Sequence, residues 1–234
     1  NISLEDGDII YLFSDGFSDQ FGGEGGKKMK KSKFKLHSLY ATVEDLFAGV
    51  NSEIISDEEI SKISFLKNAN NSVAVFTIPE QKKPKKEGIT LLLDSIRDPG
   101  NLGTIIRLSD WFNVSNIICS SDSVDCFNPK VVQATMGSLA RVKIHYLDLS
   151  VLMKEALQEK SFSIMGAYME GENISDFKFA GKGFLVMGNE SEGIRNEIAS
   201  YISQKISIPK AGSSNAESLN VSVATAILCH SLTR

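Results

Sequence analysis

The sequence predicts an α/β fold, with a mainly parallel β-sheet carrying helices on both faces and a smaller, truncated α/β domain before it. After Gly88, strand-like apolar runs alternate with helical patterns, as in successive βαβ units. The chain has 234 residues, 42% of them hydrophobic, which suits one large domain with a small attachment. Apolar runs of the roughly 18 residues that span a membrane are absent, so we expect no membrane partner.

The first 88 residues are divided by two lysine-rich segments, 22–31 and 79–88. The second has two prolines and no apolar residue, which is typical of a linker, and we place the linker at 81–88. Either segment could contact phosphate, although a lysine run is more often a solvated surface. A linker here separates an N-terminal part from residues 89–234.

The N-terminal part contains short elements on either side of the first lysine-rich segment. The run 8–13 is strand-like and ends at a turn signal. Ser56 followed by three acidic residues indicates a helix start, and 72–78 indicates a strand ended by Pro79. These elements are too few for a complete second domain.

The C-terminal part gives the regular pattern. Strands are expected at 89–93, 116–119, 141–146, 162–167, 183–187 and 205–208. Helices are expected at 102–112, 130–138, 150–159, 194–202 and 218–232. In an open parallel sheet, ligands bind beyond the carboxyl ends of the strands, so the loops there are the places to search for chemistry.

Cysteine usage and charge limit the possible functions. Cys119, Cys126 and Cys229 are odd in number and lack metal-ligand spacing, so we expect small buried side chains, a reducing cytoplasmic location and no metal. The formal net charge of −4 disfavours nucleic-acid binding by bulk charge. A net charge of −4 is still compatible with nucleic-acid binding by a local basic groove or by a surface shared between two subunits.

Three loops after predicted strands carry polar side chains. The first, 94–101, makes a Pro-Gly turn and opens a helix that places Arg107 about two turns after its start. The second, 188–193, is bounded by glycines and holds an acidic residue. The third runs from a strand ended by Pro209 to the polar start of the last helix. Each loop alone is also typical of an ordinary turn or helix cap, whereas the three together in this order indicate one site.

These loops resemble the three motifs of the SpoU (TrmH-type) RNA 2′-O-ribose methyltransferases of the SPOUT superfamily. The first motif matches at Asp98, Pro99, Asn101, Gly103 and Arg107, and the second at Gly188, Asn189, Glu190 and Gly193. The third matches at Ile208, Pro209, Gly212 and 218–222, with further family-like stretches at 125–130 and 135–138. The resemblance covers residues 89–234.

The resemblance implies a fold, an activity and partners. It implies a deep C-terminal trefoil knot, which is a rare exception to unknotted topology. It also implies a homodimer through the catalytic domain, S-adenosylmethionine as cofactor, and rRNA or tRNA rather than DNA as substrate. The implied cofactor-binding residues are Met187, Gly188, Asn189, Gly193, Ile208, Pro209, Ser218 and Leu219. The implied catalytic residues are Arg107, Asn101, Glu190, Ser218 and Asn220.

The implied chemistry is an in-line displacement by the ribose 2′-oxygen on the sulfonium methyl carbon. Alignment alone can lower such a barrier by roughly 7–11 kcal/mol. An arginine with a pKa above about 12 is a poor base at neutral pH, so we expect Arg107 to orient the hydroxyl and stabilise the developing alkoxide. The proton then passes to water or a nearby phosphate, and the other four residues position Arg107, the cofactor and the ribose.

The first 80 residues depart from the family pattern. Residues 37–80 resemble the end of the small substrate-binding domain that often precedes this catalytic domain, without its first helix and strand. Residues 1–36 instead resemble the C-terminal part of SpoIIE-like metal-dependent Ser/Thr phosphatases, in which Asp15 would bind metal. A lone aspartate cannot hold a pair of metal ions, so we expect an appended remnant without phosphatase activity. The chain starts at Asn1, and we expect a processed or excised piece.

Two other functions stay open from the residues alone. The chain could be a non-catalytic RNA-binding protein that retains the cofactor pocket, or a metal-dependent phosphatase fragment. The first predicts RNA binding without methyl transfer, and the second predicts phosphate release that depends on Asp15.

Overall fold

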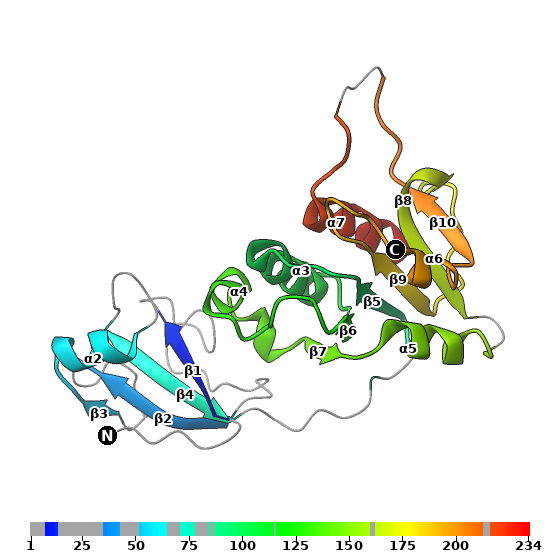
Figure 1. The fold of residues 1–234 in the computed structure, drawn as a ribbon. Helices are drawn as coiled ribbons and strands as arrows, with labels where there is room; N and C mark the ends of the chain where they lie inside the picture. The colour runs from blue at the N-terminus through cyan, green and yellow to red at the C-terminus, as the bar shows by residue number, and fades with distance from the viewer. Residues whose placement is uncertain are drawn as a thin grey trace.

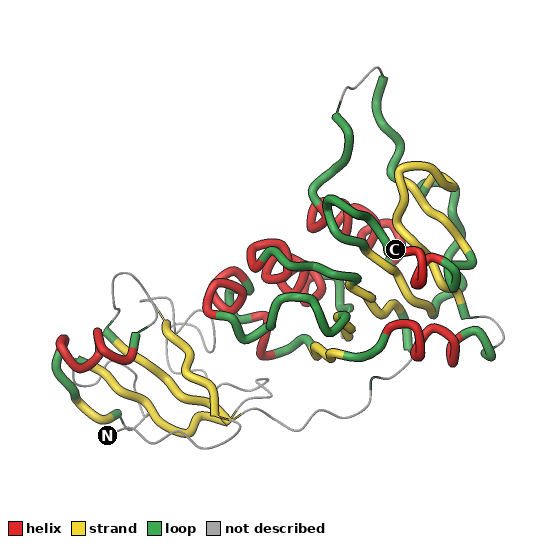
Figure 2. The backbone as a smooth tube through the Cα atoms, viewed as in Figure 1, coloured by secondary structure: helices red, strands yellow, loops and turns green. Residues whose placement is uncertain are grey.

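The computed structural model describes residues 8–13, 35–42, 52–64, 71–77, 84, 87–114, 116–159, 162–212 and 216–234. Within these ranges the chain forms two β-sheets with their helices (Figure 1, Figure 2). Asp15, the lysine-rich segment 22–31 and most of the expected linker lie outside the described residues.

The smaller sheet is built from the first 80 residues and has the strand order β1-β4-β2-β3. Its strands are β1 (Asp8–Phe13), β2 (Lys35–Ala41), β3 (Glu53–Ile54) and β4 (Ser72–Thr77). The central strand β4 pairs antiparallel with β1 and β2, and β3 pairs parallel with β2. The expected strands near 8–13 and 72–78 are therefore partners in one sheet.

The division of this region into segments 1–36 and 37–80 stays a prediction. The structure joins the two segments, because β1 from the first lies against β4 from the second along its whole length. Leu39, Ala74 and Phe76 of this sheet belong to the same buried apolar cluster as residues of the larger domain.

Helix α2 (Asp57–Ile63) covers the small sheet and begins where the sequence predicts. The Ser56 hydroxyl accepts from the Glu59 backbone N–H at 3.2 Å, and the Glu59 carboxylate accepts from the Ser56 N–H at 2.9 Å. This reciprocal capping box satisfies two helix-end donors. The Ser56 N–H and the Ser56 hydroxyl, at 2.8 Å, both donate to the Glu59 carboxylate and lower the pKa of Glu59 below its ordinary value.

The larger sheet has the strand order β10-β8-β9-β5-β6-β7, and all of its strand pairs are parallel. Its strands are β5 (Ile89–Leu93), β6 (Asn116–Cys119), β7 (Lys143–Tyr146), β8 (Ser163–Asn173), β9 (Gly183–Met187) and β10 (Gln204–Ser207). Its helices are α3 (Pro99–Trp111), α4 (Pro129–Ala134), the 3₁₀ turn η1 (Ser138–Ala140), α5 (Leu149–Ala156), α6 (Asn196–Ala199) and α7 (Val221–Leu232). The mixed α/β class with a mainly parallel sheet is confirmed.

The central strand β5 shows that helices cover both faces of this sheet. Leu91 and Leu93 are buried in the cluster that contains residues of α3, α4 and α7. Leu92, which points to the opposite face, is buried with residues of α5 and α6. A strand buried on both faces is apolar throughout, which explains the run that marks it in the sequence.

Some predicted boundaries are wrong, for local reasons. The helix expected at 130–138 ends at Ala134, because Met136 and Gly137 have positive φ angles of 49° and 83° that a right-handed helix cannot include. The helix expected at 194–202 is a single turn, Asn196–Ala199. Strand β8 is much longer than the expected 162–167, since β10 pairs with its distal half after a register shift.

Cys119, Cys126 and Cys229 are free and buried, as predicted. Burial raises the pKa of the Cys229 thiol to about 12 and raises that of Cys119 further. Helices long and apolar enough to cross a membrane do not occur in the described ranges. Those ranges also hold no group of three or more His, Cys, Asp or Glu side chains suited to a metal ion.

The contact between α3 and α4 provides a first test of the fold. A Cβ added at Gly103 would lie 2.4 Å from the Ala134 Cβ and 2.9 Å from the Val131 carbonyl oxygen, so Gly103→Ala must push the helices apart. We expect the free energy of unfolding to fall by about 1–3 kcal/mol, the usual cost of overpacking. Urea denaturation measures this loss. Thr104→Ala, at an exposed position of the same helix, is the control and should change stability little.

Candidate active site

The parallel pairing of β5 with β9 brings two of the predicted loops together. Leu93 lies beside Met187 at the end of this pair, and the Asp94 N–H donates to the Met187 carbonyl at 2.9 Å. The loops 94–98 and 188–193 therefore leave the sheet side by side. Asp98 then caps α3 by accepting from the Asn101 N–H at 2.7 Å, and Pro99 takes the first helical position.

Three polar side chains from the three predicted loops form one hydrogen-bond chain. The Asn220 Nδ2 donates to the Asn101 Oδ1 at 2.9 Å, and the Asn101 Nδ2 donates to the Glu190 carboxylate. The amide of Asn101 therefore has its acceptor and one donor engaged and lies between the other two side chains. Asn101 is half-buried, whereas Glu190 and Asn220 are exposed, so the chain is open to a ligand.

Asn220 has a second task at the start of α7. Its Oδ1 accepts from the Ser222 N–H at 2.9 Å and from the Ser222 hydroxyl at 2.6 Å. The helix therefore begins at Val221, later than the expected 218, because the Asn220 side chain caps it. With the oxygen held by the helix, the amide nitrogen is directed at Asn101.

The glycine-bounded loop 188–193 is a tight turn with Glu190 near its tip. Asn189 and Gly193 exchange backbone hydrogen bonds of 3.0 and 2.9 Å. A Cβ at Gly188 would lie 2.3 Å from the Gly193 carbonyl carbon, and Gly193 has a φ of +71°. Both glycines are therefore required by the turn itself. A Cβ at Gly193 would meet no atom within 4 Å, so that side of the loop faces open space.

A group of residues outside the predicted set ties these loops to the sheet. We call it the loop clamp and define it as Asp94, Ser95, Asp122, Asn189 and Arg195. Asp94 is completely buried and accepts from the Arg195 backbone N–H at 2.9 Å and from its Nε at 2.8 Å. Of the five, only Asn189 was predicted as a site residue. The sequence offers one signal for this group, which is that the charged residue Asp94 directly follows an apolar strand.

The charges of the loop clamp stabilise one another. The hydrogen bond from the Ser95 hydroxyl lowers the pKa of Asp122 to about 2, helped by Ser120 and by Arg195 and Arg97. The bond to Asp94 raises the pKa of Arg195.

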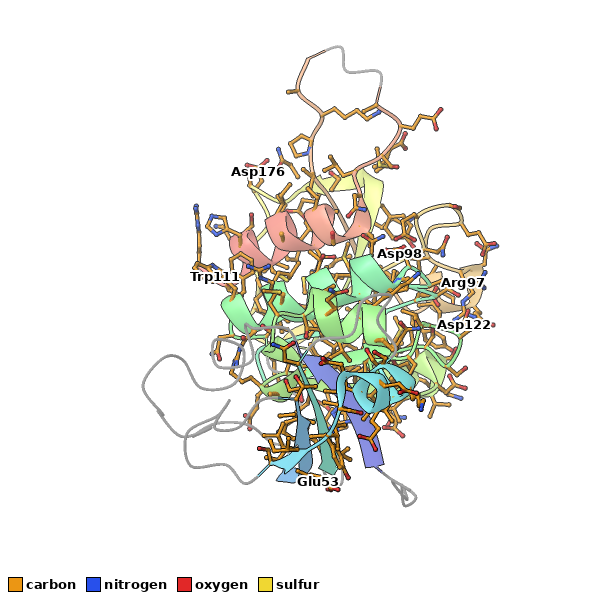
Figure 3. The ribbon with its side chains drawn as sticks, turned by 90° about the vertical axis from the view of Figure 1, so that its left-hand side faces the viewer. Glu53, Arg97, Asp98, Trp111, Asp122 and Asp176 are labelled. Atoms are coloured by element: carbon orange, nitrogen blue, oxygen red, sulfur yellow. The ribbon has the colours of Figure 1, made fainter. Side chains whose placement is uncertain are left out.

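Figure 3 shows Arg97, Asp98 and Asp122 gathered on the same side of the molecule, with Trp111 on the other.

Other predicted residues do not contact the hydrogen-bond chain in the described part of the structure. Arg107 is exposed on α3, and within the described ranges no hydrogen bond or ion pair engages its guanidinium. Pro209, Ser218 and Leu219 are exposed, Ile208 is half-buried, and Met187 is buried at the end of β9. The helix cap and loop contacts therefore organise Asn101, Glu190 and Asn220, and leave Arg107 available to a ligand.

Comparison with known proteins identifies the family. The model of the SpoU rRNA methylase family matches residues 88–230. The chain belongs to this family. Its predicted nature as an RNA methyltransferase is thereby confirmed.

Two curated relatives of this SpoU family member are named as ribosomal RNA methyltransferases. The 23S rRNA (guanosine(2553)-2′-O)-methyltransferase RlmP of Bacillus subtilis is 29% identical over 189 residues, covering 80% of this chain and 75% of RlmP. The 23S rRNA (guanosine-2′-O-)-methyltransferase RlmB of Escherichia coli K12 is 35% identical over 138 residues, covering 58% of this chain and 56% of RlmB.

Solved structures similar to this SpoU family member extend over nearly its whole length. A putative RNA methyltransferase of the TrmH family from Porphyromonas gingivalis has a TM-score of 0.82 at 30% identity, covering 97% of this chain and 90% of that one. An AdoMet-bound rRNA methyltransferase from Sinorhizobium meliloti has a TM-score of 0.77 at 26% identity, covering 97% and 87%. The predicted activity class and the predicted cofactor, S-adenosylmethionine, are confirmed by these findings.

The low pKa of Asp122 predicts a pH dependence of stability. A carboxyl group whose pKa is lowered on folding stabilises the fold above its unfolded pKa of about 3.9, and this contribution is lost as pH falls toward about 2. Asp122→Asn should therefore be less stable than the wild type at neutral pH, and the gap should close through this acid range. Urea denaturation of both proteins at several pH values measures it. A gap that stays constant with pH would contradict the assignment.

Because the tight turn at 188–193 leaves no room for a side chain at Gly188, we predict that a substitution there weakens ligand binding selectively. Gly188→Ala must displace the turn, and misplacing a binding group by about 1 Å can cost on the order of 100-fold. We expect a loss of this order in affinity for S-adenosylhomocysteine, measured by titration calorimetry. The control is Gly181→Ala, at an exposed position with a φ of +89° and no neighbour within 4 Å. It strains the backbone without touching the turn and should bind normally.

Proposed function

We propose that this chain transfers the methyl group of S-adenosylmethionine to the 2′-hydroxyl of a ribose in RNA, with ribosomal RNA as the substrate class. The observation that carries the proposal is the chain Asn220–Asn101–Glu190, which joins one side chain from each of the three motifs. Both RlmP and RlmB are named as 23S rRNA enzymes, which favours ribosomal over transfer RNA.

The cofactor site is assigned to the loops at the carboxyl edge of the sheet. Its residues are Met187, Gly188, Asn189, Gly193, Ile208, Pro209, Ser218 and Leu219. The open sides of Gly193 and Gly212 fit a ligand held by backbone groups, and Ile208 and Leu219 supply apolar surface for an adenosine. When bound, the cofactor supplies an electrophilic methyl group on its sulfonium sulfur. With the cofactor bound, the loops would have to hold this methyl group in line with the ribose oxygen.

Arg107 is assigned to the ribose hydroxyl. Its guanidinium is exposed and has no partner in the described part of the chain, so its donors are available to the substrate oxygen. It orients the hydroxyl and stabilises the negative charge that develops on the oxygen as the methyl transfers. Arginine retains its own proton, so the hydroxyl proton leaves to water or to a neighbouring RNA phosphate.

Four polar residues position Arg107, the cofactor and the ribose: Asn101, Glu190, Ser218 and Asn220. The Asn101 amide is locked between Asn220 and Glu190, which leaves the Glu190 carboxylate as the exposed acceptor end of the chain. An exposed carboxylate can accept from ribose or cofactor hydroxyls. Ser218 lies two residues before Asn220 on the exposed segment that leads into α7. It contributes a further hydroxyl at this edge.

The assembly we assign is a knotted homodimer in the cytoplasm. The contacting helices α3 and α7 expose the apolar side chains Trp111 (84%), Val223 (48%) and Ile227 (37%), which are suited to contact with a second copy. Residues of α7 lie in the same buried cluster as residues of α3, and we assign the trefoil knot of the family to this C-terminal part of the chain. Three free, buried thiols accord with a reducing compartment.

Residues 37–80 are assigned to RNA capture as a partial substrate-binding domain, and residues 1–36 to an appended phosphatase-like remnant. The structure supports a common scaffold for both, since β1 completes the sheet of β2 and β4. Asp15 lies outside the described residues, and we assign no phosphatase activity to this segment.

The decisive experiment measures methyl transfer. RNA from cells with and without this protein, compared by mass spectrometry, should differ by one 2′-O-methyl mark. In vitro, Arg107→Ala should reduce methyl incorporation from labelled S-adenosylmethionine by roughly 100- to 1,000-fold, the usual effect of removing one donor to a developing oxyanion.

The control is Lys154→Ala, which removes an exposed positive charge from α5 and should retain wild-type activity. Unchanged methyl incorporation in Arg107→Ala would overturn the role of Arg107. RNA binding by the wild type without any incorporation would favour the non-catalytic RNA-binding alternative.

A further inference from the structure

The loop clamp lies where β5, β6 and β9 end, next to the predicted site, with which it shares Asn189. Its five members come from the loops after these three strands and from the residue before α6. None of Asp94, Ser95, Asp122 and Arg195 belongs to the set assigned to cofactor or substrate. We propose that the loop clamp is a positioning device, which holds the loop 188–193 against the loop 94–98 so that Glu190 meets Asn101. This proposal rests on the proposed function of the site.

The first tie is the ion pair between Asp94 and Arg195. A completely buried carboxylate is tolerated only when it is paired and hydrogen-bonded. Arg195 supplies both its backbone N–H and its guanidinium to Asp94, at 2.9 and 2.8 Å. Because main chain and side chain are both engaged, the whole residue is fixed relative to the end of β5. Gly193, two residues earlier, is then held where it closes the turn with Asn189.

The second tie runs through Ser95, whose φ of 60° is uncommon for a residue other than glycine. Its carbonyl accepts from the Asn189 Nδ2 at 2.9 Å, its N–H donates to the Ser120 hydroxyl at 2.8 Å, and its hydroxyl donates to Asp122. A strained backbone of this kind persists where the surroundings over-determine it. The first of these bonds joins the two loops directly.

The third tie is Asp122, which serves both loops from the end of β6. Its carboxylate lies 3.4 Å from the Arg97 guanidinium and 3.7 Å from that of Arg195. Arg97 belongs to the loop that leads to Asn101, and Arg195 to the segment that follows Glu190. One carboxylate therefore sets the spacing between the chains that carry these two side chains.

An ion pair outside the loop clamp, between α3 and η1, provides a comparison. Arg141 lies 2.7 Å from Asp110 near the far end of α3, with 39% and 25% of the two side chains exposed. Arg195 is similarly exposed, at 36%. The Arg141 pair joins α3 to η1 and contacts neither loop. Of the two pairs, the one between Arg195 and Asp94 connects the loops of the site.

The test compares Arg195→Gln, Arg195→Lys and Arg141→Gln with the wild-type chain. Binding of S-adenosylhomocysteine is measured by titration calorimetry without RNA, and thermal melting is recorded for each protein. We expect Arg195→Gln to bind roughly 10- to 100-fold more weakly, as for a misplaced binding loop. Arg195→Lys should recover part of this loss, because an ammonium can pair with Asp94 but cannot also reach Asp122. Arg141→Gln should lower the melting temperature less than Arg195→Gln, because Asp110 is partly exposed whereas Asp94 is buried, and it should bind as tightly as the wild type.

Methyl-transfer kinetics complete the test. Arg195→Gln should raise the KM for S-adenosylmethionine and lower kcat, and Arg195→Lys should lie between it and the wild type. Wild-type affinity in Arg195→Gln, or an equal loss in Arg141→Gln, would overturn the positioning role and leave the proposed function standing. A wild-type chain that binds no S-adenosylhomocysteine would overturn the proposed function, and this inference with it.

Discussion

The parallel register between β5 and β9 is the constraint on which the rest of the structure depends. It sets Leu93 beside Met187, so two loops that are far apart in the sequence leave the sheet from adjacent positions. Parallel strands need a crossover between them, and here everything from α3 to β8 lies in that crossover. Polar residues placed directly after such strands therefore gather at one edge, where they can act on a common ligand.

That edge combines a buried ionic layer with an exposed hydrogen-bonding layer. Asp94 and Arg195 form the lower layer, in which the carboxylate is withdrawn from water. Glu190 and Asn220 form the upper layer and remain accessible. Because the lower layer cannot rearrange without leaving a buried charge unpaired, the upper layer is preorganised before a ligand arrives.

Much of this architecture could be predicted from the sequence, because the relevant signals are local. The strands at 89–93 and 183–187 are marked by continuous apolar runs, and the site loops by glycines and polar residues directly after them. Local signals failed where the backbone departs from its usual form, as at Met136 and Gly137, which end α4 early. They also failed for the partnership of Asp94 with Arg195, since nothing near either residue indicates a partner 101 positions away.

Asn220 couples the completion of the site to the last helix of the sequence. The same side chain caps α7 through its oxygen and reaches Asn101 through its nitrogen. During translation, α3 and the loop 188–193 leave the ribosome well before α7 is available. A nascent chain that has folded its sheet as far as β10 therefore still lacks the third member of the hydrogen-bond chain. The hydrogen-bond chain is complete only when the C-terminal helix docks.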